Sequence, residues 1–166
     1  MQLLSVSQPW AWAIARGRKL VENREWAPSY RGQLAIYASM RVDLRASESP
    51  LIWFAGWDPG DPVAVMGGIV AVVTLADVCA AAMTGGSCDC GEWARPNAYH
   101  WRLADPQPLV RPVVSIGRSG PMADGIPMRI ISHRGIPAEE LPSDQRGLWE
   151  PAPAVVAEVT AAVSHA

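Results

Sequence analysis

The chain has 166 residues, of which 49% are hydrophobic and 18% are charged, a composition typical of one folded globular domain. Its formal net charge of −2 argues against non-specific clamping of long duplexes, because that mode of binding depends on many phosphate contacts. The longest apolar stretch, residues 62–76, is too short to span a bilayer, and the first residues do not resemble a signal peptide. We therefore expect a cytoplasmic protein with no membrane partner.

The first element predicted in chain order is a short helix near the N-terminus. Ser7 is suited to cap it, Pro9 to occupy its first turn and Gly17 to end it. Trp10 and Ile14 share one helical face at i, i+4 spacing, which is enough to anchor the helix on a core.

Strands are expected at intervals after this helix. Residues 68–78 (GIVAVVTLADV) are rich in β-branched side chains and predict a buried strand. Further strands or extended segments are expected at residues 19–25, 33–39, 98–103, 109–116 and 147–149. Other elements are expected as a short helix within residues 41–60, a loop at 85–96 and a helix with an apolar face at 152–163.

Strands with short helices and no regular βαβ alternation predict an α+β, barrel-like fold. Residues 117–145 carry four glycines and four prolines with little periodicity, so we expect a surface insertion there. No repeat and no linker divides the sequence. The prediction is a single domain over residues 1–166.

One lysine is conspicuous among the basic residues. Thirteen of the fourteen are arginine, and only Lys19 is lysine. A lysine retained in such a chain indicates a position that needs a compact amine able to lose its proton, which a guanidinium cannot do. Chance retention is the alternative.

A series of short motifs resembles one known family. The N-terminal pieces are Gln8-Pro9-Trp10-Ala11, Gly17-Arg18-Lys19, Glu22-Asn23-Arg24, Trp26, Arg31-Gly32 and Ile36. The downstream pieces are Gly68 to Val73, Ala76-Asp77-Val78, Tyr99-His100-Trp101 and Gly147-Leu148-Trp149. In this order and spacing they resemble the ASCH family, named for the activating signal cointegrator homology domain.

The resemblance implies a PUA-like β-barrel with a cleft beside the first helix and residues 19–24. Family members are associated with RNA or DNA binding and with modified bases. A small bacterial relative hydrolyses N4-acetylcytidine with a lysine, a threonine three residues later and a distant glutamate. Lys19 matches that lysine, Glu22 stands at the threonine position, and Asp77 and Glu92 are both candidates for the distant acid.

Lys19 and Glu22 are the candidate catalytic residues. A lysine near a carboxylate could clamp a carbonyl oxygen, or act as a base if its pKa is lowered. In a straight strand the two side chains would lie on opposite faces, so sharing a pocket requires a turn or bulge. A structural ion pair with Arg24 is the alternative.

The candidate ligand-binding residues are aromatic, basic or hydroxylic. Trp10 and Trp26 could stack on a base, with core packing as the alternative. Arg24 and Arg31 could contact phosphate or base, or be solvated surface side chains. Ser39 could contact a ligand or simply cap the end of its strand.

The cysteines suggest a metal site only weakly. Cys88 and Cys90 could join Cys79 and His100 around zinc, but a C-x-C pair is shorter than the usual spacing and no second tight pair follows. We therefore expect free thiols, no metal and no cofactor.

The leading hypothesis is a module that binds RNA, single-stranded DNA or a modified nucleoside in the cleft. Whether the protein is an enzyme stays open: an amidohydrolase acting on an acylated nucleoside and a ribonuclease are alternatives that use the same cleft. A protein-interaction role would depend on residues 117–145, and protein partners are not specified by the sequence.

Overall fold

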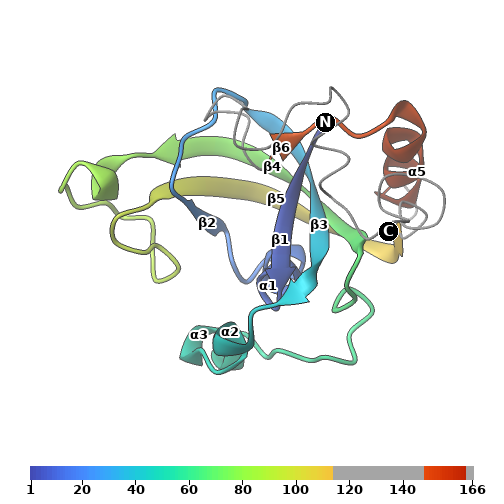
Figure 1. Ribbon diagram of the computed structural model, residues 1–166, viewed down its shortest axis with the longest axis horizontal. Coiled ribbons are helices and arrows are strands. Elements are labelled where there is room, and N and C mark those ends of the chain that lie inside the picture. The colour runs from blue at the N-terminus through green and yellow to red at the C-terminus, as the bar shows by residue number, and fades with distance from the viewer. Residues whose placement is uncertain (114–147, 164–166) are drawn as a thin grey trace.

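The protein, seen in a computed structural model that describes residues 1–113 and 148–163, is built on one mixed sheet that curls into a half-barrel (Figure 1). The strands in the described ranges are β1 (Gln2–Gln8), β2 (Val21–Arg24), β3 (Gly32–Val42), β4 (Gly68–Cys79), β5 (Tyr99–Val113) and β6 (Leu148–Trp149). The sheet order is β2-β5-β4-β3-β1-β6, with β1 and β3 parallel and the other neighbours antiparallel. The predicted α+β, PUA-like barrel fold is confirmed.

Short helices flank the sheet, as predicted. They are α1 (Trp10–Ala15), α2 (Leu44–Ser47), α3 (Pro50–Phe54) and α5 (Pro153–Val163), with a 3-10 turn η1 (Ala81–Met83). None of the helices in the described part of the chain is long and apolar enough to cross a membrane.

Alternation of side chains along the strands produces two apolar faces. One face packs against α1, and its strand residues include Leu4, Val6, Leu34, Ile36 and Val73. The other face packs against α5 through Val159, and its strand residues include Leu3, Ala35, Tyr37, Ile69 and Val72. The prediction of an apolar helix over residues 152–163 is therefore confirmed.

The start of α1 differs from the prediction. Ser7 does not cap the helix, because residues 2–8 form β1, a strand that the sequence analysis missed, and Pro9 is the N-cap. The buried Gln8 side chain takes over the capping role: its Oε1 accepts a hydrogen bond from the Trp12 amide at 3.0 Å. Its Nε2 donates to the Val63 carbonyl at 3.0 Å, so Gln8 also ties the helix start to the loop before β4.

The two strands predicted at residues 98–103 and 109–116 are instead parts of one strand as far as residue 113, where the described segment ends. β5 runs unbroken from Tyr99 to Val113, although it contains Pro106 and Pro108. Register shifts in its pairing with β4 absorb these residues, as β-bulges do. The predicted surface insertion at residues 117–145 lies outside the described residues.

Asp61 joins α1 to the loop before β4, and its contacts lead to a pH prediction. The hydrogen-bonded Arg16 guanidinium lowers the pKa of Asp61 from 3.8 to about 2, and a bond from the Trp12 indole contributes. A carboxylate with a depressed pKa adds stability that is lost as pH falls through its folded-state value. We expect the midpoint of urea unfolding to fall between pH 4 and 2 more steeply in the wild type than in Asp61→Asn. Parallel curves for the two proteins would contradict this.

Candidate functional site

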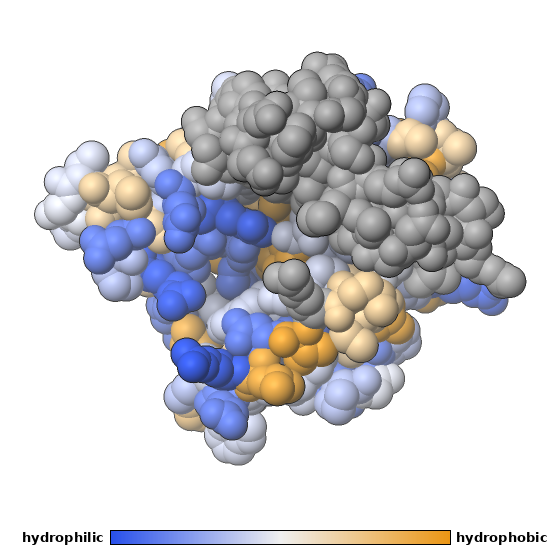
Figure 2. All heavy atoms as spheres, in the orientation of Figure 1, coloured by the Kyte–Doolittle hydropathy of each residue, from blue (hydrophilic) through white to orange (hydrophobic). Residues whose placement is uncertain are grey.

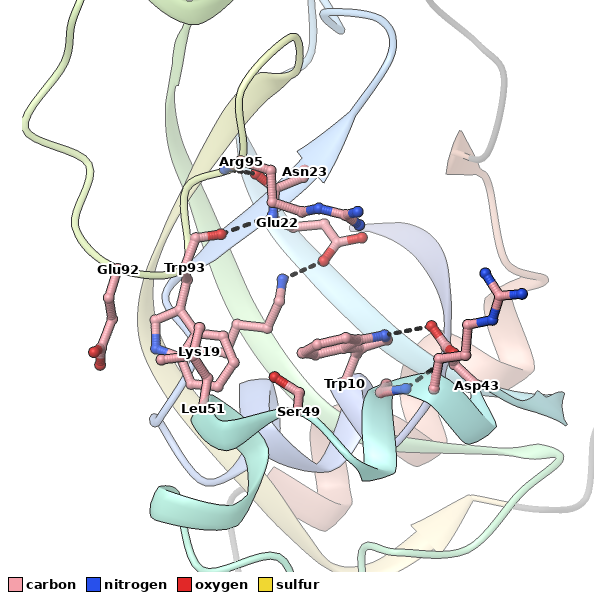
Figure 3. A pocket seen from close by; sticks show the side chains of 12 residues that line it. Trp10, Lys19, Glu22, Asn23, Asp43, Ser49, Leu51, Glu92, Trp93 and Arg95 are labelled. Atoms are coloured by element: carbon pink, nitrogen blue, oxygen red, sulfur yellow. Dashed lines mark hydrogen bonds and ion pairs between the residues drawn. The ribbon is translucent and has the colours of Figure 1, made fainter.

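A pocket of about 560 Å³ opens between α1, the α2–α3 segment and the loop from β4 to β5 (Figure 3). Its lining residues are Trp10, Lys19, Glu22, Asn23, Asp43, Arg45, Ala46, Ser49, Leu51, Glu92, Trp93 and Arg95. Figure 2 shows hydrophilic side chains gathered around a hollow in this face of the molecule. The pocket lies beside the first helix and residues 19–24, where the family resemblance implied a cleft.

Lys19 reaches the pocket because the chain turns sharply after α1. Gly17 adopts a left-handed conformation (φ 67°), and the amides of Arg18 and Lys19 both donate to the Ala13 carbonyl, at 2.9 and 3.0 Å. Lys19 therefore precedes β2 instead of lying in it. This turn is the feature that allows Lys19 and Glu22 to line one pocket.

The charged group in the pocket wall is buried. Lys19 is 3% exposed and Glu22 is 8% exposed. The Lys19 ammonium is hydrogen-bonded to the Glu22 carboxylate and donates to the Val21 carbonyl at 2.5 Å. Arg24 Nε lies 3.1 Å from the other Glu22 oxygen, and Arg24 also donates to the Ser5 carbonyl at 2.7 Å.

Burial and pairing shift both titrating groups. Burial lowers the pKa of Lys19 below its ordinary value, although Glu22 opposes the shift. Burial alone would raise the pKa of Glu22, but the Lys19 and Arg24 charges outweigh it and hold that pKa below its usual range. An ammonium has three N–H donors, and two are directed at protein oxygens, so one is left for a ligand.

Two tryptophans form the aromatic part of the pocket. The rings of Trp10 and Trp93 meet edge to face with centroids 6.1 Å apart, and Lys19 Nζ lies 5.9 Å from the Trp10 ring centre. The Trp10 indole N–H donates to Asp43 at 3.1 Å, which fixes the ring. Figure 3 shows Trp10 and the Lys19 amine on the same side of the pocket.

Asn23 connects β2 to the loop that carries Trp93. Its Nδ2 donates to the Trp93 carbonyl at 2.8 Å, and its Oδ1 accepts from the Arg95 amide at 2.9 Å. The sequence analysis placed Asn23 in a family motif without assigning it a role, and it did not name Trp93 among the candidate residues. Nothing in the order of the residues shows that the loop folds back over Lys19.

Four of the predicted ligand-binding residues are not among the described residues that line the pocket. Trp26 packs edge to face on Trp101 at 4.8 Å, and Arg24 lies behind Glu22. Arg31 donates to the Pro28 and Tyr30 carbonyls. Ser39 lies within β3. A ligand contact by any of the four stays a prediction.

The two candidates for the distant acid are placed differently. Glu92 lines the pocket, on the same loop as Trp93. The Asp77 side chain is largely exposed on β4, 3.9 Å from Arg31, and does not line it. Of the two candidates, only Glu92 thus lines the same pocket as Lys19, and Figure 3 shows its carboxylate directed away from the Lys19 amine.

A second cavity of about 320 Å³ adjoins the first. It shares Leu51, Glu92 and Trp93 with the pocket, and its other lining residues are Gly17, Arg18, Phe54 and Ala55. Trp53 and Phe54 of α3 are 74% and 78% exposed and meet edge to face at 5.2 Å. Apolar rings thus extend from the pocket onto the surface.

The fold and the pocket define a PUA-like barrel with an open pocket lined by polar and aromatic side chains. Residues 4–112 match the model of the ASCH domain, and the chain belongs to the ASCH domain family. Similar solved structures include the ASCH protein from Zymomonas mobilis, at 16% identity and TM-score 0.49 over 96% of this chain and 93% of that one. A tyrosine-to-phenylalanine mutant of the same protein matches at 15% identity and TM-score 0.47 over 96% of each chain. No curated protein matches.

Proposed function

We propose that this ASCH domain binds single-stranded RNA by taking one exposed base into the pocket. The carrying observation is the buried Lys19–Glu22 pair beside Trp10 and Trp93, which puts donors, acceptors and aromatic faces in one cavity. Sequence-specific RNA recognition commonly works in this way, with a splayed-out base stacked on aromatic rings and hydrogen-bonded at its edge.

The charge balance of the pocket supports a base as its occupant more than a phosphate. Three cationic side chains, Lys19, Arg45 and Arg95, are matched by three acidic ones, Glu22, Asp43 and Glu92. The carboxylates would repel a polyphosphate, whereas the edge of a neutral base can hydrogen-bond to cationic and to anionic side chains. Glu22 accepts from an amino group in this arrangement, and the free Lys19 N–H donates to a carbonyl.

The surface beside the pocket supports an RNA oligonucleotide, rather than a free nucleoside, as the ligand. The second cavity and the exposed rings of Trp53 and Phe54 continue from the pocket wall, and stacking of one base on such a ring contributes about 1–3 kcal/mol. Trp53→Ala should therefore weaken binding of an oligonucleotide and leave binding of a mononucleoside unchanged. An equal loss of affinity for the oligonucleotide and the mononucleoside would contradict a stacking role at this surface.

The test is fluorescence anisotropy with labelled single-stranded RNA 12-mers of each base, with an RNA duplex and a DNA 12-mer for comparison. If Arg45 and Arg95 each contact one phosphate, the slope of log K against log salt should be about −1.4. Arg45→Gln should weaken binding, and Arg111→Gln, which removes an equal charge on the exposed surface of β5 outside the pocket, should not. Binding that is abolished by Arg111→Gln alone would place the site elsewhere.

A second candidate function, amide hydrolysis on an acylated nucleoside, is favoured by the presence of Lys19 and Glu92 in the lining of one pocket. In this scheme Lys19 donates to the acyl carbonyl and Glu92 removes a proton from water, whose oxygen attacks the carbonyl carbon. The C–N bond then breaks, the amine receives the proton, and N4-acetylcytidine plus water gives cytidine plus acetate.

Chromatography of cytidine released from N4-acetylcytidine tests this scheme. Glu92→Gln removes the proposed general base and should slow turnover by at least about 100-fold. Asp77→Asn is the matched control. No cytidine at high enzyme concentration would remove this candidate and leave RNA binding untouched.

A further inference from the structure

A cluster of three cysteines and one histidine joins the ends of β4 and β5. Cys79 is the last residue of β4 and pairs in register with His100 near the start of β5. Cys88 and Cys90 lie in the loop between the two strands. The path of this loop brings both thiols close to Cys79 and His100. The three Sγ atoms and a ring nitrogen of His100 all lie within 4.8 Å of one another.

The spacing of these four atoms suits a tetrahedral metal ion. With Zn–S bonds of about 2.3 Å, ligand atoms at the corners of a tetrahedron stand roughly 3.8 Å apart, so a small contraction of this cluster would close it on zinc. Three thiolates and one imidazole are one of the ligand sets of structural zinc sites. Soft sulfur ligands also disfavour magnesium and calcium, which take oxygen ligands.

The orientation of His100 is a separate observation that supports metal binding. Its ring is buried, at 2% exposed, and Nε2 lies 2.8 Å from the Arg95 carbonyl oxygen. A carbonyl only accepts, so we assign the ring hydrogen to Nε2, which leaves the lone pair on Nδ1. Nδ1 faces the thiols, 3.2 Å from Cys88 Sγ. Histidine ligands of metals are commonly fixed in this way by a backbone carbonyl.

We propose that Cys79, Cys88, Cys90 and His100 bind one zinc ion that fixes the loop between β4 and β5. The same loop carries Glu92, Trp93 and Arg95 to the pocket, so the ion would also hold one pocket wall in place. This metal site does not depend on which ligand the pocket binds.

The first test measures metal in the full-length protein, expressed with added zinc and purified under reducing conditions. Elemental analysis should give one zinc per chain. Cys88→Ser, which alters an exposed ligand, should lose the metal while its circular dichroism stays native. Glu92→Gln, a change of a non-ligand on the same loop, should keep it, and Cys88→His, which restores a fourth ligand, should recover it.

Cobalt substitution gives a second readout on unmutated protein. Stoichiometric Co²⁺ added to zinc-stripped protein should produce thiolate-to-metal charge-transfer absorption and the visible bands of a tetrahedral site. Removal of zinc with a chelator should lower Tm, and re-addition should restore it. The proposal is overturned if the wild type purifies with far less than one zinc per chain and Co²⁺ gives no thiolate band, or if Cys88→Ser retains full metal content.

Discussion

Replacing Glu22 with glutamine should reduce the free energy of unfolding by about 3–5 kcal/mol, because it removes one partner of a buried ion pair. Lys19 and Arg24 both direct cationic groups at this carboxylate, and Lys19 is nearly inaccessible to water. Without the carboxylate, the ammonium keeps the cost of burial and loses the charge that compensates for it. Urea unfolding followed by far-ultraviolet circular dichroism measures the change.

The matched control is Asp77→Asn, which breaks an exposed acid–arginine pair. Its partners stand 3.9 Å apart with largely solvated side chains, so the cost should stay within about 0.5 kcal/mol. A loss below about 1 kcal/mol in Glu22→Gln would contradict the electrostatic description of the buried cluster.

The same variant should change the response to acid. The pKa of Glu22 lies below its usual value of 4.5, so its stabilising contribution is complete at neutral pH and declines as pH falls through the folded-state pKa. Wild-type stability should therefore fall faster below pH 4.5 than that of Glu22→Gln. Lys19 acts at the alkaline end of the pH range. Because its pKa is lower in the folded state than in the unfolded state, the folded state loses this proton at a lower pH, and stability increases as pH rises from the folded-state pKa towards 10.5.

The parts of the fold that the sequence predicted are those with a strong local pattern. The run of β-branched residues in β4 and the apolar face of α5 needed no tertiary information. β1 was missed because Ser7 and Pro9 suit the start of a helix, although Leu4 to Ser7 alternate apolar and polar side chains as a strand does. β5 was divided in two because Pro106 and Pro108 interrupt its pattern, and bulges that compensate for prolines are not visible in a sequence.

The candidate site shows the same limit. Lys19 could be selected as the single lysine and from the family motif, and the structure places it in the pocket. Trp93 and Arg95 could not, because they belong to a loop whose path depends on the hydrogen bonds of Asn23. The cysteine cluster is similar: Cys79 and His100 are adjacent only because β4 and β5 pair, and spacing rules for zinc motifs do not include strand pairing.

A double variant, Lys19→Met with Glu22→Leu, separates a structural role of the buried pair from a binding role. Replacement of a buried ion pair by apolar side chains of similar size is often neutral or stabilising, so the free energy of unfolding should change by less than about 1–2 kcal/mol. The double variant should therefore be more stable than Glu22→Gln. Arg24 keeps its hydrogen bond to the Ser5 carbonyl in this background.

Binding should respond in the opposite way. The variant removes one donor and one acceptor, each a charged group whose hydrogen bond contributes about 1.5–3 kcal/mol, and every 1.4 kcal/mol is tenfold in affinity. Affinity for the labelled single-stranded RNA should thus fall by at least about 100-fold, while Arg111→Gln, which removes an exposed charge outside the pocket, leaves it unchanged. Affinity within threefold of the wild type would mean that the pair supports the fold alone. Stability kept and binding lost would mean that the chain retains a buried ion pair, which its fold does not require, in order to recognise a base.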